Sequence, residues 1–210
     1  MKKYPAVLLA VLLALASVSY SGLSEAIKEN ESGDTSFCSN GQHFTTEEVQ
    51  QALDLFFADL EQRSEVNREL FAQAVRAGDA GQVYTEPGQP FGEISLRALT
   101  TRRLIKTTTV VDFLGNSINF QAHAYAQYDP AVNPHRFSAC KNAWTDAIGI
   151  NYVGFSVSSS PRGYTYAIIN SGKTLAVTTD TYISIAGAGV VNSSGVFTNY
   201  VEFSYTQLSL

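Results

Sequence analysis

Apolar residues recur at helical spacing between residues 45 and 77, and from about residue 95 they alternate with polar ones. Thr45 and Glu48 have the spacing of a capping box, so the helical region begins there, and "AGDAG" at 77–81 ends it. The pattern predicts one bent helix, or two helices that break near Arg63 and Ser64. The apolar stripes, whose aromatic residues we assign to the core, are Val49, Ala52, Leu53, Phe56 and Leu60, and then Val66, Leu70, Phe71, Ala74 and Val75.

Beyond a loop rich in proline and glycine at 85–92, the composition shifts toward Thr, Val, Tyr and Ile, which favour strands. Alternation predicts strands at about 95–113, 118–128, 151–158, 163–169, 174–186 and 196–208. In the second strand one face is apolar, and its even-numbered positions are Ile118, Phe120, Ala122, Ala124 and Ala126. The polar face holds Asn119, Gln121, His123, Tyr125 and Gln127.

The segment "NSSG" at 192–195 has turn residues between two alternating runs and predicts a hairpin. With Ser193 and Ser194 as the loop, the pairs would be Tyr182 with Tyr205, Ser184 with Phe203, and Ile185 with Glu202. Residues 131–149, with Cys140 and the only tryptophan, Trp144, look like an excursion tethered by a disulfide, with a helical turn after Ser138.

Helices followed by antiparallel strands predict an α+β domain, with N-terminal amphipathic helices packed on a curved, mostly antiparallel sheet. The passage from "VQQALDLFFADLEQ" to "AVRAGDAGQVY" contains Gly78, Asp79 and Tyr84. These residues resemble the step from the first to the second helix in the NTF2-like superfamily, which includes SnoaL-like and ketosteroid-isomerase-like proteins. The resemblance implies a cone over residues 43–208 with an apolar cavity at its mouth. A lipocalin-like or other antiparallel β-barrel with N-terminal helices is the alternative.

The first residues, "MKKYPAVLLAVLLALASVSYSG", place two lysines before a short apolar run and small residues. This order predicts a secretory signal peptide at 1–21, too short in its apolar part to span a bilayer. We expect a flexible polar leader at 22–42 and a single secreted, extracellular domain at 43–210.

Removing residues 1–21 takes away Lys2 and Lys3 but no acid, and so leaves 12 basic and 19 acidic residues, a formal charge of −7. Such a chain is repelled by nucleic acid and by anionic lipid. The sequence has no nucleophile elbow, phosphate loop or dinucleotide fingerprint, and its three histidines lack the spacing of metal ligands. We therefore expect no cofactor, no metal and no membrane span.

Cys38 and Cys140 are the only cysteines, and in a secreted chain they predict one disulfide bond. A catalytic thiol is the alternative, since His43 and His135 each lie five residues from a cysteine. Asn30 and Asn192 begin sequons and would carry glycans in a eukaryotic cell.

The candidate chemistry is sparse. His123, Asp180 and Tyr182 are the candidate catalytic residues, because an imidazole, a carboxylate and a phenol can transfer protons. A solvent-facing role for His123, and an ordinary polar edge for the other two, are the competing interpretations. Tyr125, Glu202 and Tyr205 are the candidate ligand-binding residues. A basic cluster could hold an anion or protect an edge strand, and it consists of Arg97, Arg102, Arg103 and Lys106.

These observations favour a secreted, non-enzymatic domain that binds a small apolar molecule or a protein partner. Two alternatives remain open. The first is a cofactor-independent NTF2-like enzyme, of isomerase or hydratase type, that uses an acid or base in its cavity. The second is a structural interaction module that forms a homodimer through an open sheet face.

Overall fold

The computed structural model describes residues 28–29, 35–39, 42–78, 83–85, 99–114, 116–148, 155–187 and 191–209. Within them the chain forms one α-helix, α2 (Thr46–Ala77), and a final 3-10 turn, η2 (Tyr205–Leu208). The strands are β1 (Lys28–Glu29), β2 (Thr35–Ser39), β3 (Gln42–Thr45), β4 (Val83–Thr85), β5 (Thr100–Phe113), β6 (Asn116–Tyr128), β7 (Phe137–Ile148), β8 (Phe155–Ile169), β9 (Thr174–Gly187) and β10 (Val191–Ser204).

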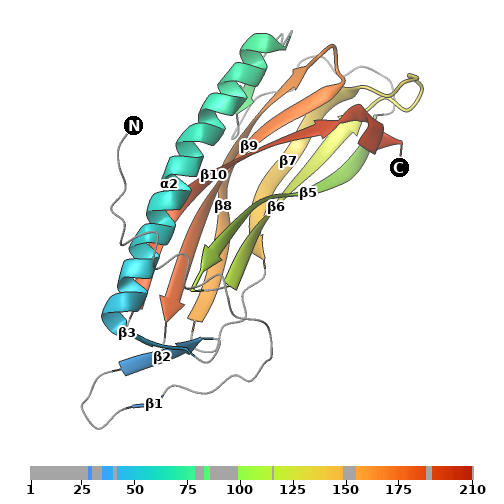
Figure 1. Ribbon diagram of the computed structural model, residues 1–210. Coiled ribbons are helices and arrows are strands. Elements are labelled where there is room, and N and C mark those ends of the chain that lie inside the picture. The colour runs from blue at the N-terminus through green and yellow to red at the C-terminus, as the bar shows by residue number, and fades with distance from the viewer. Residues whose placement is uncertain are drawn as a thin grey trace.

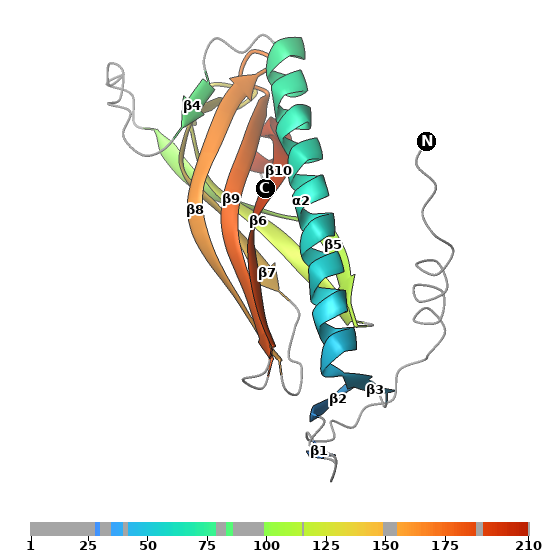
Figure 2. The same cartoon turned by 90° about the vertical axis from the view of Figure 1, so that its left-hand side faces the viewer.

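The strands form three antiparallel sheets, in the orders β1-β2-β3, β10-β9-β8-β4 and β5-β6-β7. The second and third, here called the β8–β10 sheet and the β5–β7 sheet, share their inner side chains in common core clusters and therefore lie face to face. Helix α2 runs along the β8–β10 sheet beside β10, and β2 and β3 lie at its beginning (Figures 1 and 2).

The predicted fold class is wrong in its helices. In the part of the chain that is described, one helix of 32 residues replaces the expected N-terminal helices, and two facing sheets replace a single curved one. Tyr84, which was expected to end a second helix, lies in β4 and pairs with Tyr166 of β8. The expected leader also contains β1 and β2.

The start of α2 is as predicted, because it depends on local chemistry. The Thr45 side chain accepts a hydrogen bond from the Glu48 amide, and the Glu48 carboxylate accepts one from the Thr45 amide. The predicted break at Ser64 does not occur. The Ser64 hydroxyl instead donates to the Leu60 carbonyl of the preceding turn and accepts a hydrogen bond from the Thr198 amide of β10. Ser64 therefore marks the point where the helix crosses β10.

The two halves of α2 pack differently. The first stripe is buried, and Val49, Leu53, Phe56 and Leu60 enter the same core cluster as Phe120 and Phe197. In the second half, Phe71, Ala74 and Val75 pack on the outer face of the β8–β10 sheet, against Ala167, Ile169 and Ala176. Val66 and Leu70 remain 54% and 42% exposed, so the predicted second stripe is only partly buried.

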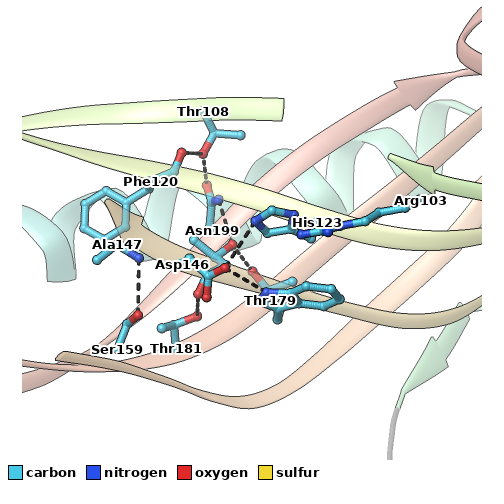
Figure 3. A network of polar contacts seen from close by, with 12 residues as sticks. Arg103, Thr108, Phe120, His123, Asp146, Ala147, Ser159, Thr179, Thr181 and Asn199 are labelled. Atoms are coloured by element: carbon cyan, nitrogen blue, oxygen red, sulfur yellow. Dashed lines mark hydrogen bonds and ion pairs between the residues drawn. The ribbon is translucent and has the colours of Figure 1, made fainter. Parts of the chain in front are cut away.

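A buried polar network separates the two apolar clusters between the sheets (Figure 3). Thr145 of β7 lies 2.6 Å from the Thr179 hydroxyl of β9 and accepts a hydrogen bond from the Asn199 amide of β10 at 3.0 Å. Asn199 in turn accepts a hydrogen bond from Thr108, which a bulge in β5 directs inward. These bonds satisfy polar groups that would otherwise be costly to bury.

The hairpin of β9 and β10 has a different register from the predicted one. Tyr182 pairs with Val196, Ser184 with Ser194, and Glu202 with Ala176. The "NSSG" segment is therefore part of β10, and the connection falls at 188–190, outside the described residues. The small residues serve packing instead, because a Cβ added at Gly195 would lie 2.8 Å from Phe57 Cδ1 of α2.

Residues 137–148 were predicted to be an excursion with a helical turn, yet they form β7, which pairs with β6 along its length. Their alternation was hidden by inward residues that are small. Ala143 and Thr145 are buried between the sheets. Trp144 and Asp146, which alternate with them, point to the other side of the sheet.

Candidate binding surface

The outer face of the β5–β7 sheet carries the polar side chains of β6, as predicted from alternation. The even-numbered positions of β6 from Ile118 to Ala126 are fully buried between the sheets, so the odd-numbered positions point outward. Ile105 of β5 and Trp144 of β7 lie in register on either side of His123. Ile105 is 45% exposed and Ile148 is 43% exposed, so much of this face is open to solvent.

His123 is nevertheless buried, which contradicts the expectation of a solvent-facing residue. Its side chain is only 3% exposed. The indole of Trp144 stacks on the imidazole, with ring centroids 4.7 Å apart and planes 13° from parallel. Arg103 Cζ lies 5.5 Å from the centroid of the Trp144 ring, and Tyr125 packs against the same ring at 5.7 Å. These residues, together with Asp146, are called the His123 cluster.

The hydrogen bonds of the cluster fix the proton on His123. A terminal nitrogen of Arg103 lies 3.1 Å from His123 Nδ1, and because a guanidinium only donates, Nδ1 must accept. The neutral ring therefore carries its proton on Nε2. Nε2 lies 3.2 Å from Asp146 Oδ2, but their alignment is not that of a hydrogen bond, and Nε2 remains a buried polar atom without such a partner. The same Asp146 oxygen accepts a hydrogen bond from Trp144 Nε1 at 2.9 Å.

Burial lowers the pKa of His123 below its ordinary value of 6.5 because it removes water from the charged form. The Asp146 carboxylate opposes this effect, and the Arg103 guanidinium adds to it. Figure 3 shows Arg103 and Asp146 approaching the imidazole from different strands. The imidazole is thus neutral at pH 7 and is shielded from solvent, whereas the guanidinium that contacts it is exposed.

Asp180 and Tyr182 do share one face, but it is the outer face of the other sheet. Asp180 accepts a hydrogen bond from the Thr198 hydroxyl at 2.6 Å. Arg162 Cζ lies 5.0 Å from the centroid of the Tyr182 ring. Because the two outer faces point away from each other, the structure does not bring these residues together with His123.

The three predicted ligand-binding residues are also dispersed. Tyr125 belongs to the His123 cluster. Glu202 is exposed on the outer face of β10, where its carboxylate accepts a hydrogen bond from the Tyr200 hydroxyl. Tyr205 lies in η2, beneath the guanidinium of Arg136.

The predicted basic cluster is divided between two faces of β5. Arg103 points outward, whereas Arg102 donates to the Leu208 carbonyl and Lys106 to the Glu202 carbonyl, at the side where β5 meets β10 and η2. Arg97 lies outside the described residues.

The structure describes only some of the residues on which the cysteine and sequon predictions depend. Cys140 is 5% exposed in the core, and its sulfur donates to the Asn142 carbonyl at 3.4 Å. The Cys38 side chain lies outside the described residues, as does Asn30, so the disulfide and the first sequon stay predictions. Asn192 is exposed, but it lies within β10 opposite Ala186 rather than in a turn.

A surface groove of about 580 Å³ lies between α2 and the beginning of β10. Asp54, Glu61 and Arg68 line it together with Phe57 and Val196. This groove is half polar and open, unlike the apolar cavity expected at the mouth of a cone. In the described part of the chain, no group of three His, Cys, Asp or Glu side chains is placed to hold a metal ion.

Sequence reasoning missed Trp144 and Asp146 as site residues. The signal was present in "NAWTDAI" at 142–148, where small residues alternate with Trp144 and Asp146. Comparison with known proteins adds nothing to the geometry, because no protein-family model, curated protein or solved structure matches the chain. The likeness to the NTF2-like superfamily therefore stays a prediction.

Proposed function

We propose that this chain is a secreted, non-enzymatic module that binds a protein partner on the outer face of the β5–β7 sheet. The observation that carries the proposal is the His123 cluster, in which an exposed arginine and two aromatic rings lie together on an open sheet face. Trp, Tyr and Arg are the residues that most often dominate the energy of protein interfaces. Exposed isoleucines at positions 105 and 148 add apolar area to the same face.

A protein partner suits this surface better than a small apolar molecule. Small-molecule sites are concave and mostly apolar, whereas the outer face belongs to a three-stranded sheet and carries charged residues on its two outer strands. The groove between α2 and the beginning of β10 is lined by three charged side chains. Tyr125 is the predicted ligand-binding residue that this proposal retains.

A cofactor-independent acid–base enzyme is supported less well. A general base must reach the proton that it removes, yet His123 is covered by Trp144 and is 3% exposed. Asp180 and Tyr182 lie on the other outer face and could not act on the same substrate.

The expected charge and the N-terminal sequence support the choice of partner class. A formal charge of −7 after removal of residues 1–21 disfavours nucleic acid. None of the helices in the described residues combines the length and the apolarity needed to cross a membrane. The lysines and apolar run at 1–21, outside the described residues, support secretion, and a homodimer is among the assemblies that the face would accept.

The test places a photoreactive phenylalanine analogue at Tyr125 of the full chain, and at Tyr182 of a control chain. Irradiation in the medium of the secreting cells should attach a discrete protein to position 125 and little to position 182. Trp144→Ala should reduce the yield at position 125 at least about tenfold, as expected for an interface residue of this kind. Arg162→Ala, which removes an arginine from the other aromatic pair, should leave that yield unchanged. Equal labelling at both positions, or none at either, would refute the proposal.

A further inference from the structure

The outer face of the β5–β7 sheet carries one charge of each sign at positions that are related across His123. Arg103 lies on β5, in the row of Tyr125, and Asp146 lies on β7, in the row of Gln121. His123 is on the strand and in the row between them. The two charges therefore lie on the two outer strands of the sheet, diagonally opposite each other across His123.

Within the part of the chain that the structure describes, neither charge is fully used. None of the ion pairs found among the described residues includes Arg103, whose guanidinium contacts only a neutral imidazole and an indole face. Asp146 is 43% exposed in its side chain, and only its Oδ2 atom takes part in the contacts with Trp144 and His123. Arg103 therefore has donors, and Asp146 an acceptor, for a partner.

We infer that the partner is a second copy of this chain, which packs on the same face with Arg103 of each protomer against the partner's Asp146. This inference rests on the proposed function of the face. A two-fold axis that passes between two opposite charges brings each charge of one protomer to the opposite charge of the other, so the contact forms twice. A single surface with the two signs diagonally opposite each other is thus complementary to itself.

The size of the face agrees with this assembly. Three strands of about 13 residues, spaced by about 4.8 Å, give a face of roughly 600 Å² per protomer. Two such faces bury about 1,200 Å² together, the lower end of the range for specific interfaces. Ile105, opposite His123 and near the centre, would be covered in the dimer.

The same arrangement is not available on the outer face of the β8–β10 sheet. There, α2 already covers Ala167, Ile169 and Ala176. Asp180 accepts a hydrogen bond from the Thr198 hydroxyl, which also accepts one from Arg68 of α2. On this face, therefore, part of the surface is already occupied by α2, and the Thr198 hydroxyl beside Asp180 is linked to the helix.

The experiment measures the mass of the purified full-length secreted chain by sedimentation equilibrium over a range of micromolar concentrations. The wild-type chain should dimerise. Arg103→Asp and Asp146→Arg should each weaken the dimer about tenfold or more, because each creates two like-charge contacts. An equimolar mixture of the two variants should restore dimers, since each foreign charge then meets its opposite. Arg162→Asp, on the other sheet, should leave the dissociation constant unchanged.

Ile105→Lys provides a second route if Asp146→Arg disturbs the contact with Trp144, because position 105 is exposed and tolerates a polar side chain. This variant should also weaken the dimer. A chain that stays monomeric at about 100 μM would overturn the inference, and so would a mixture of the two charge variants that remains monomeric. If a monomeric chain still attaches a different protein at position 125, only the identity of the partner is wrong, and the proposed function survives.

Discussion

The two outer faces of this molecule each carry an arginine beside an aromatic ring, but among the described residues a helix packs on part of one face and none packs on the other. On the β8–β10 sheet, Arg162 lies over Tyr182, and the second half of α2 packs farther along the same face. On the β5–β7 sheet, Arg103 lies over Trp144, while Ile105 remains 45% exposed. The same kind of pair thus occurs both on a face that the helix partly covers and on a face that stays exposed.

The residues beneath the helix differ in size from those on the open face. Ala167 and Ala176 are fully buried under α2, and Gly195 contacts the Phe57 ring, so the helix backbone can approach closely. The open face has Trp144, Ile105 and Ile148, which stand above the sheet and would hold a helix away. The alanines at positions 167 and 176 therefore help α2 to approach the covered face closely.

The sharpest test of this difference concerns the anchoring of α2. Leu60→Ala should lower the free energy of unfolding by about 2–5 kcal/mol, because it leaves a cavity in the core beside the crossing at Ser64. Val66→Ala, at a position that is 54% exposed on the same helix, should change it by less than about 0.5 kcal/mol. Urea denaturation measures both values. Similar losses in the two variants would mean that α2 does not pack as described.

A second test compares the two sides of the β5–β7 sheet with the same substitution. Thr145→Val keeps the shape of the side chain but removes the hydrogen bonds that the Asn199 amide nitrogen and the Thr179 hydroxyl make with Thr145, at a cost of about 1–3 kcal/mol. Thr107→Val, on the exposed outer side, should be nearly neutral. Thermal and urea unfolding of both variants decide the matter. A neutral Thr145→Val would mean that the polar network between the sheets contributes little to stability.

Local patterns in the sequence were sufficient for the elements whose causes are local. The capping box at Thr45 and Glu48 placed the first residue of α2, and alternation in 118–128 assigned the inner and outer faces of β6. By contrast, "NSSG" at 192–195 has the chemistry of a turn and lies inside β10, where Gly195 leaves room for the Phe57 ring of α2. A contact with a distant helix cannot be inferred from the four residues alone.

The site was harder to predict than the fold for the same reason. Alternation placed His123 outward, and an outward residue on a two-layer protein is expected to be exposed. Its burial depends on Trp144 from β7 and Arg103 from β5, whose registers with β6 are set by pairing across the sheet. Asp180 and Tyr182 failed as partners of His123 because the sequence did not tell which sheet each strand joins.

The smallest expected effect concerns the proton on His123. Its pKa in the folded chain lies below the ordinary value of 6.5, so the unfolded chain binds more protons at pH values between the two. Folding stability contributed by the neutral imidazole is therefore present above pH 6.5 and declines as the pH falls toward the folded-state pKa. His123→Gln keeps an acceptor for Arg103 but cannot titrate, so its urea midpoint should fall less than that of the wild-type chain between pH 7.5 and pH 5. His135→Gln, whose parent side chain contacts the Val132 carbonyl outside the cluster, is the matched control and should keep the wild-type slope. If His123→Gln and wild type lose stability equally over this range, burial does not hold the imidazole neutral. Water would then reach the His123 ring despite the stacked Trp144 indole.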